Sequence, residues 1–117
     1  MIRKNLSLIC LFFLMLLYSC LSLGSDELDS AFKRRSIMIS SSNQSCNHFV
    51  VWLAETRNQQ TRGLMYVKSL PKNTGMLFIY PNSNIRAMWM KNTFISLDMI
   101  FIDENGIVSS IEKNTEP

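Results

Sequence analysis

The stretch at residues 87–98, AMWMKNTFISLD, gathers side chains of the kinds that bind ligands. Trp89 offers a flat apolar surface, Lys91 a positive charge, and Asn92 and Thr93 hydrogen-bonding groups. Ligand pockets typically combine aromatic surface with a few polar groups that fix orientation. Arg62, upstream in the chain, adds a second positive charge, which would favour an anionic ligand. The sequence therefore predicts a ligand-binding site made by Arg62, Trp89, Lys91, Asn92, Thr93 and Asp98.

Asp98 interrupts an apolar run, LDMIFI at residues 97–102. In a strand over these residues both faces would otherwise be apolar, and a buried carboxylate must be paired or hydrogen-bonded. Arg62, Arg86 and Lys91 are the candidate partners for an ion pair. Alternatively, the carboxylate faces the ligand, or it is the acid–base group of an enzyme that acts on glycans of the cell envelope.

Cys46 and His48 lie two positions apart, so on a strand they would point to the same face. Such a pair could form a thiolate and an imidazolium, as nucleophilic catalysis requires. No oxyanion-hole motif accompanies them, and no glycine-rich phosphate loop or zinc-ligand spacing occurs in the chain. We therefore assign no catalytic residue and expect a binding module rather than an enzyme, without a metal or cofactor.

Methionine suggests an alternative function. Met88 and Met90 would share one face of a strand, and His48 could add an imidazole. Thioethers suit Cu(I), which prefers soft sulfur ligands. Methionine also fills irregular cores, however, and the chain lacks repeated Met/His motifs. A methionine-based copper-binding protein is thus the alternative, and core packing is the favoured role.

The first 24 residues have the pattern of a secretory signal. Arg3 and Lys4 precede an apolar run at residues 6–23, and small and acidic residues follow. Cleavage after Gly24 is expected. An uncleaved anchor is the alternative, because the run approaches the roughly 20 residues that span a bilayer. Either way, the chain is expected to be exported, with its remainder in the periplasm or anchored in the cell envelope.

A second cleavage site competes with the first. LYSC at residues 17–20 is similar to the motif of bacterial lipoproteins, in which the cysteine becomes the lipidated first residue. Tyr18 is bulkier than that motif usually carries. Cys20 is therefore a candidate lipidation site, and contact with a membrane is expected only through the signal or this lipid.

Charge and cysteine content limit the partners of residues 25–117. Ten Lys and Arg residues and nine Asp and Glu residues remain there, which gives a net charge of about +1. Nucleic-acid binding needs a clustered basic surface, so no nucleic-acid partner is expected. Only Cys46 remains, which excludes an intramolecular disulfide within this segment. The expected partner is a small molecule or an envelope protein.

The pattern along the chain predicts a mostly β fold. Residues 25–45 are polar and serine-rich, which indicates a flexible tether with one short strand at 36–40. Apolar and β-branched runs predict strands at 48–54, 76–80, 85–90, 97–103 and 107–112. The last two should form a hairpin around ENG at 104–106. Because no long crossover helix is present, residues 46–117 are predicted to form a small antiparallel β-sandwich or jelly-roll-like barrel.

One short helix is predicted at residues 57–62. Thr56 is a favourable N-cap, and Gln59 completes a capping box in which each side chain serves an unpaired backbone N–H group. Gly63 suits the left-handed residue that ends a helix.

Four blocks in this order resemble the DUF192 (UPF0127) family, a domain of unknown function. They are RGLM at 62–65, GMLF at 75–78, WMKNT at 89–93, and LD at 97–98 followed by Phe101. The resemblance covers about residues 49–117 and implies a small jelly-roll-like β-sandwich, often exported, with no agreed reaction. Family members generally continue for several strands beyond the position of Pro117. The chain is thus expected to be truncated and its sandwich incomplete, with open strand edges.

Overall fold

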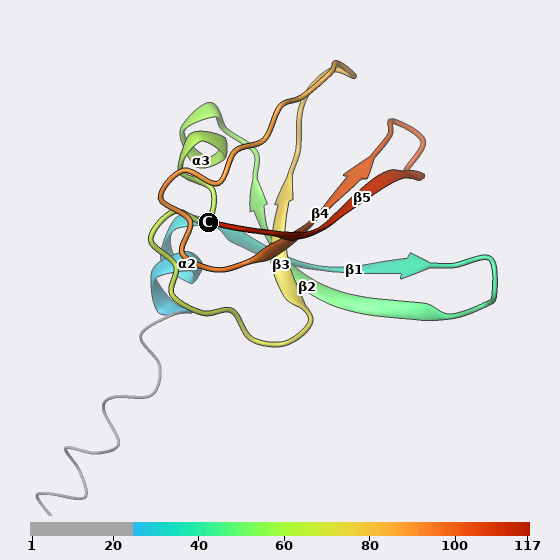
Figure 1. Cartoon of the computed structure of the whole chain (residues 1–117), viewed down its shortest axis with the longest axis horizontal. Coiled ribbons are helices and arrows are strands. Elements are labelled where there is room, and N and C mark those ends of the chain that lie inside the picture. The colour runs from blue at the N-terminus through green and yellow to red at the C-terminus, as the bar shows by residue number, and fades with distance from the viewer. Residues whose placement is uncertain (1–24) are drawn as a thin grey trace, which may run out of the picture.

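The computed structural model describes residues 25–117 (Figure 1). The predicted signal segment and Cys20 lie outside these residues. The described chain runs through α2 (Asp26–Ala31), β1 (Lys33–Ser40), β2 (Cys46–Ala54), α3 (Arg57–Arg62), β3 (Thr74–Phe78), β4 (Leu97–Ile102) and β5 (Val108–Thr115). The prediction of a mostly β fold is confirmed, with two short helices in place of one.

β1 and β2 form a long antiparallel hairpin whose distal end projects from the rest of the chain (Figure 1). The register is regular from Lys33 opposite Leu53 to Ser40 opposite Cys46. The proximal half of β2 is buried and its distal half is exposed. The strand predicted at 48–54 is therefore confirmed and begins two residues earlier.

β3 pairs with β2 in parallel, so the first sheet is mixed, in the order β1-β2-β3. The prediction of a purely antiparallel fold is wrong here. Parallel neighbours need a crossover connection, usually a long helix. In this chain residues 55–73 provide it with the short helix α3 and an irregular loop.

β4 and β5 form the predicted hairpin as a separate two-stranded antiparallel sheet. At its turn the Asp103 carboxylate accepts hydrogen bonds from the backbone N–H groups of Asn105 and Ile107, both at 2.9 Å. Gly106 adopts a φ of 78°, which favours glycine. Within residues 25–117 the two sheets are not closed into a barrel, which corrects that part of the prediction.

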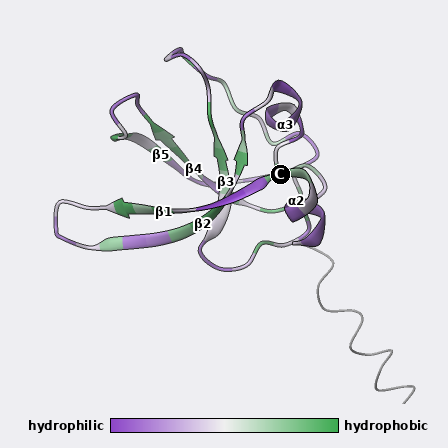
Figure 2. Ribbon diagram, turned by 180° about the vertical axis from the view of Figure 1, so that it is seen from behind, coloured by the Kyte–Doolittle hydropathy of each residue, from purple (hydrophilic) through white to green (hydrophobic). Residues whose placement is uncertain are grey.

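The core lies between α2, the proximal part of β2 and the segment after α3. Its buried members are Leu28, Phe32, Trp52, Ala54 and Leu64. Two of them come from residues 25–45, predicted as a tether; these residues instead carry α2 and all of β1. Figure 2 shows the contrast between hydrophobic residues on β3 and β4 and the largely hydrophilic helix α3.

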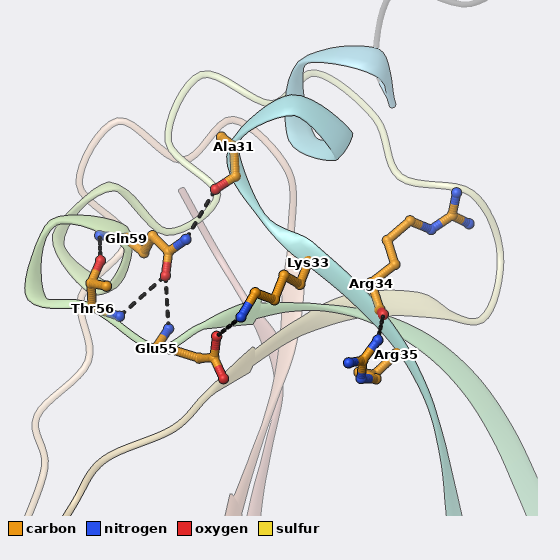
Figure 3. A network of polar contacts seen from close by, with 7 residues as sticks. All are labelled: Ala31, Lys33, Arg34, Arg35, Glu55, Thr56 and Gln59. Carbon is orange, nitrogen blue, oxygen red and sulfur yellow. Dashed lines mark hydrogen bonds and ion pairs between the residues drawn. The ribbon is translucent and has the colours of Figure 1, made fainter.

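α3 begins with the predicted capping box. The backbone N–H of Gln59 donates to Oγ1 of Thr56 at 3.3 Å, and Oε1 of Gln59 accepts from the backbone N–H of Thr56 at 3.1 Å. Nε2 of Gln59 also donates to the carbonyl of Ala31 at 3.0 Å, as Figure 3 shows. One side chain thus caps α3 and ties it to the end of α2. Gly63 ends the helix at a φ of 48°.

Residues 79–96 connect β3 to β4 without regular structure. The strand predicted at 85–90 is wrong. The alternation of apolar side chains is present there, but alternation yields a strand only when a neighbour supplies hydrogen bonds, and no described strand pairs with this segment. Separately, none of the helices within residues 25–117 is long and apolar enough to cross a membrane.

Candidate functional site

The segment Lys91-Asn92-Thr93 forms a tight turn. The backbone N–H of Thr93 donates to the carbonyl of Met90 at 3.1 Å, and Asn92 has a φ of 55°. Asparagine tolerates this left-handed conformation better than most residues. Thr93 is buried, and its hydroxyl donates to the Lys91 carbonyl at 3.4 Å. Thr93 therefore stabilises the turn, whereas Lys91 and Asn92 are exposed.

Tyr66 joins this turn, and the sequence did not indicate it. Its backbone N–H donates to the Asn92 carbonyl at 2.8 Å, and Nδ2 of Asn92 donates to the Tyr66 hydroxyl at 3.1 Å. The Tyr66 ring meets the Phe94 ring edge to face, with centroids 5.9 Å apart. The φ of Tyr66, 66°, is unusual for a bulky residue, and no local pattern predicts it.

Three aromatic side chains in this region are mostly exposed. The exposed fractions are 74% for Trp89, 63% for Tyr66 and 55% for Phe94. Trp89 lies on the same loop, three residues before Asn92. We call Tyr66, Trp89, Asn92 and Phe94 the aromatic lip. Rings held on a hydrogen-bonded turn could stack on a flat ligand, while Lys91 beside them could attract an anionic group.

Arg62 is engaged elsewhere. Its guanidinium forms an ion pair with Glu27 of α2 and lies 5.5 Å from the ring centre of Phe32. The structure therefore uses Arg62 to attach α3 to α2, and none of its described polar contacts reaches the aromatic lip. Its charge would act on a ligand there only at a distance.

Asp98 lies at a bulge between β4 and β5. The register passes from Leu97 opposite Thr115 to Met99 opposite Glu112, so β5 holds one extra residue beside Asp98. Oδ1 of Asp98 accepts the backbone N–H of Asn114 at 3.0 Å. The carboxylate is exposed, and in residues 25–117 it forms none of the ion pairs considered above. Its contact satisfies a donor that the bulge leaves without a ladder partner.

Met90 and His48, which the sequence suggested as joint copper ligands, lie on different parts of the fold. Met90 packs beside the end of β5, where the Thr115 hydroxyl contacts its sulfur at 3.6 Å. His48 lies on the projecting hairpin, and Cys46 is exposed as a free thiol at the start of β2. Among the described residues, no group of three or more histidine, cysteine or acidic side chains could hold a metal ion.

A shallow depression of about 540 Å³ lies beside α2 and the start of β1. It is lined by Asp29, Ser30, Ala31, Phe32, Lys33, Arg34, Arg35 and Gln59. Lys33 pairs with Glu55 at 3.5 Å, and Arg34 pairs with Asp29 at 3.4 Å (Figure 3 shows the first pair). Lys33 and Arg34 thus already have acidic partners, and Arg35 donates to the Arg34 carbonyl at 3.2 Å. The pairing of Lys33 and Arg34 reduces the attraction for an anion.

Comparison with known proteins places the chain among uncharacterised relatives. A crystal structure of a Sinorhizobium meliloti 1021 protein, described as a candidate transcription regulator, matches with a TM-score of 0.72 and 31% identity. The match covers 74% of this chain and 67% of that one. A protein of unknown function from Novosphingobium aromaticivorans DSM 12444 matches with a TM-score of 0.71 and 30% identity over 75% of this chain and 62% of that one.

No curated protein matches the chain. The model of the DUF192 family, described as uncharacterized ACR, COG1430, matches residues 38–117. This match spans more than half of the chain and includes all four sequence blocks that suggested the resemblance. The chain therefore belongs to the DUF192 family.

Proposed function

We propose that this DUF192 protein is a non-enzymatic binding module of the cell envelope and that the aromatic lip is its recognition surface. The observation that carries the proposal is the pair of hydrogen bonds between Tyr66 and Asn92, which fixes the exposed Tyr66 ring, and with it the Phe94 contact, at the turn. Large apolar side chains gathered on an exposed surface mark interaction sites. The occupant is a small molecule or a partner protein.

The charges around the lip favour a ligand with a flat apolar face and an anionic group. Lys91 is exposed in the same turn, and its ammonium group is absent from the described ion pairs. A ring of the ligand would stack on Trp89 or Tyr66, and the anion would approach Lys91. The amide of Asn92 is already held by Tyr66, so it is oriented before a ligand arrives, which lowers the entropic cost of binding.

The contacts of Asp98 support binding over glycan chemistry. Oδ1 of its carboxylate accepts the Asn114 N–H group and stabilises a bulge. A general acid or base would instead need a reactive proton within hydrogen-bond reach. One relative is described as a candidate transcription regulator, which suggests nucleic-acid binding as another function. Nucleic-acid binding needs a clustered basic surface. Lys33 and Arg34 are paired with carboxylates, which favours a partner of another kind.

Export is part of the proposal and rests on residues 1–24. The basic Arg3 and Lys4 followed by an apolar run support it. Cell fractionation tests it: the protein should leave the cytoplasm, and Cys20→Ala should release it from membranes if Cys20 carries lipid. Retention of the intact protein in the cytoplasm would contradict export.

A thermal-shift screen tests the recognition surface. A ligand that binds only the folded chain adds about 2.7 kcal/mol of stability at 100 times its Kd, so it should raise Tm measurably. Trp89→Ala and Lys91→Ala should remove the shift. Ile85→Ala is the matched control, because Ile85 is exposed on the same connection but lies outside the lip.

Two outcomes of this screen would contradict the proposal. A ligand whose shift persists in both Trp89→Ala and Lys91→Ala binds elsewhere. If no metabolite and no envelope protein binds the full chain while a longer DUF192 relative binds one, the surface is not sufficient for recognition.

A further inference from the structure

We propose that the distal half of the β1–β2 hairpin binds Cu(I) through three soft side chains: the thioether of Met38, the thiolate of Cys46 and the imidazole of His48. This site is separate from the aromatic lip. It also differs from the methionine pair at 88 and 90 that the sequence suggested.

The strand register brings these side chains to one face. Met38 on β1 lies directly opposite His48 on β2, and Ser40 lies opposite Cys46. Because side chains alternate along a strand, Cys46 and His48 share a face, and Met38 lies on that same face across the ladder. Directly opposite Cβ atoms are about 4.5–5.5 Å apart, and diagonal neighbours about 7–8 Å. One metal ion between the three side chains is within reach of all of them.

The hairpin holds this arrangement with ordered local contacts. At its tip, Ser41 and Ser45 are joined by a backbone hydrogen bond of 2.9 Å, and Gln44 turns the chain at a φ of 64°. Oδ1 of Asn43 accepts the hydroxyl of Ser45 at 2.8 Å. A site built on paired strands that end in a bonded turn is positioned more accurately than a site on a free loop.

All three side chains are exposed, so an ion can reach them. Met38 is 72% exposed although methionine is normally a core residue, and it lies outside the core cluster. Cys46 is an exposed free thiol, and His48 is exposed beside it. Figure 1 shows this part of the hairpin projecting into solvent, where an ion can enter and leave.

The chemistry of the donors selects the ion. Thiolate and thioether are soft ligands that favour Cu(I), and imidazole also binds copper. None of the three side chains supplies the oxygen ligands that Mg²⁺ or Ca²⁺ prefers. The thiolate neutralises the single positive charge of Cu(I), so the bound site carries no excess charge. Three ligands on an exposed face leave one side open for exchange of the ion with another carrier.

Anaerobic titration of the full chain with Cu(I), in competition with a chromophoric Cu(I) chelator, tests the site. We expect one Cu(I) per chain. Cys46→Ser should abolish this binding, and Met38→Leu and His48→Gln should each weaken it roughly 10-fold or more, on the scale of changes seen around metal ligands. Met88→Leu is the matched control, since Met88 is also partly exposed but lies on the 79–96 connection.

X-ray absorption of the copper-loaded chain gives a second measurement. It should detect two sulfur ligands and one nitrogen ligand, with one sulfur lost in Met38→Leu. Circular dichroism should show that each variant keeps the wild-type fold.

Three results would overturn the proposal. The first is no Cu(I) binding by the folded, reduced chain. The second is wild-type affinity in both Met38→Leu and His48→Gln, which would leave the cysteine as an isolated ligand. The third is one Cu(I) for every two chains, bridged by two copies of Cys46. None of these outcomes bears on the aromatic lip, so the two proposals fail independently.

Discussion

Tyr66 and Asn92 are joined by two hydrogen bonds, one between their backbones and one between their side chains, although both residues adopt a positive φ. Such conformations cost of order 1–3 kcal/mol each and persist where the surroundings enforce them. Each residue thus helps to enforce the conformation of the other. This mutual constraint holds the Tyr66 side of the aromatic lip against the turn that contains Asn92.

Two substitutions of Asn92 should separate its backbone role from its side-chain role. Asn92→Ala removes the amide that contacts Tyr66 and places a less tolerant residue at a φ of 55°, so we expect a loss of about 1–2 kcal/mol. Asn92→Gly removes the amide but relieves the backbone, so its loss should be smaller. Urea unfolding measures both. Equal losses would mean that backbone strain at this position is negligible.

Asp29 should stabilise the attachment of α2 to the sheet. Its Oδ1 accepts the Nε1–H of the buried Trp52 at 2.7 Å, and hydrogen bonds to charged groups contribute about 1.5–3 kcal/mol. Because Asp29 is partly exposed, Asp29→Ala should cost about 1–2 kcal/mol in chemical denaturation. Asp26→Ala, an exposed position on the same helix, is the control and should change little. If the two variants were equally stable, residues 25–40 would behave as a tether.

Both the oxygen and the nitrogen of the Gln59 side-chain amide should contribute to the stability of the fold. Gln59→Glu keeps an oxygen that can accept the N–H groups of Glu55 and Thr56 but loses the donor to the Ala31 carbonyl. Gln59→Ala loses all three contacts. We expect Gln59→Ala to cost about 1–2 kcal/mol, as for loss of a helix cap, and Gln59→Glu to fall between it and the wild type. A glutamate variant as stable as the wild type would show that the Ala31 contact contributes nothing.

Substitutions of Asp98 distinguish a structural carboxylate from a catalytic one. Asp98→Asn retains an oxygen for the Asn114 N–H group, so its stability should stay within about 0.5 kcal/mol of the wild type. Asp98→Ala leaves that bulge donor without its partner and should cost about 1 kcal/mol. Thermal unfolding of both variants checks the order. A turnover of envelope glycan that disappears in the folded Asp98→Asn variant would support the enzyme instead.

Features encoded by neighbouring residues could be predicted from the sequence. The helix at 57–62 depends on Thr56 and Gln59, three positions apart, and the last hairpin depends on the turn around Gly106. The tight turn after Met90 is likewise closed by a local hydrogen bond, from the Thr93 N–H to the Met90 carbonyl. In each case the decisive contacts lie within a few positions along the chain.

Features that depend on distant residues could not be predicted. Leu28 and Phe32 are core residues only because Trp52 and Leu64 cover them, and the polar residues around them resemble a tether. The strand expected at 85–90 has the correct alternation but pairs with no described strand. The direction of β3 is set by how residues 55–73 cross the sheet, which the strand's own residues do not reveal.

The same limit applies to the candidate site. The polar turn and Trp89 were found because they are neighbours in sequence. Tyr66 entered only through its contacts with Asn92, 26 positions away. Arg62 was assigned to the site because of its charge, but in the fold this charge forms an ion pair with Glu27. Composition therefore located one side of the lip, and the tertiary structure supplied the other.

The mixed order of the first sheet has a consequence for how the chain folds. β1 and β2 are joined by five residues, and such hairpins form on the order of microseconds. β3 can join only after residues 55–73 have closed a longer loop, and non-local parallel pairing is intrinsically slower. We expect the hairpin to form first and the docking of β3 to limit the rate. Until then the β3-facing edge of β2 has unpaired backbone groups, and this transient edge is where the chain is most exposed to misassociation with another copy.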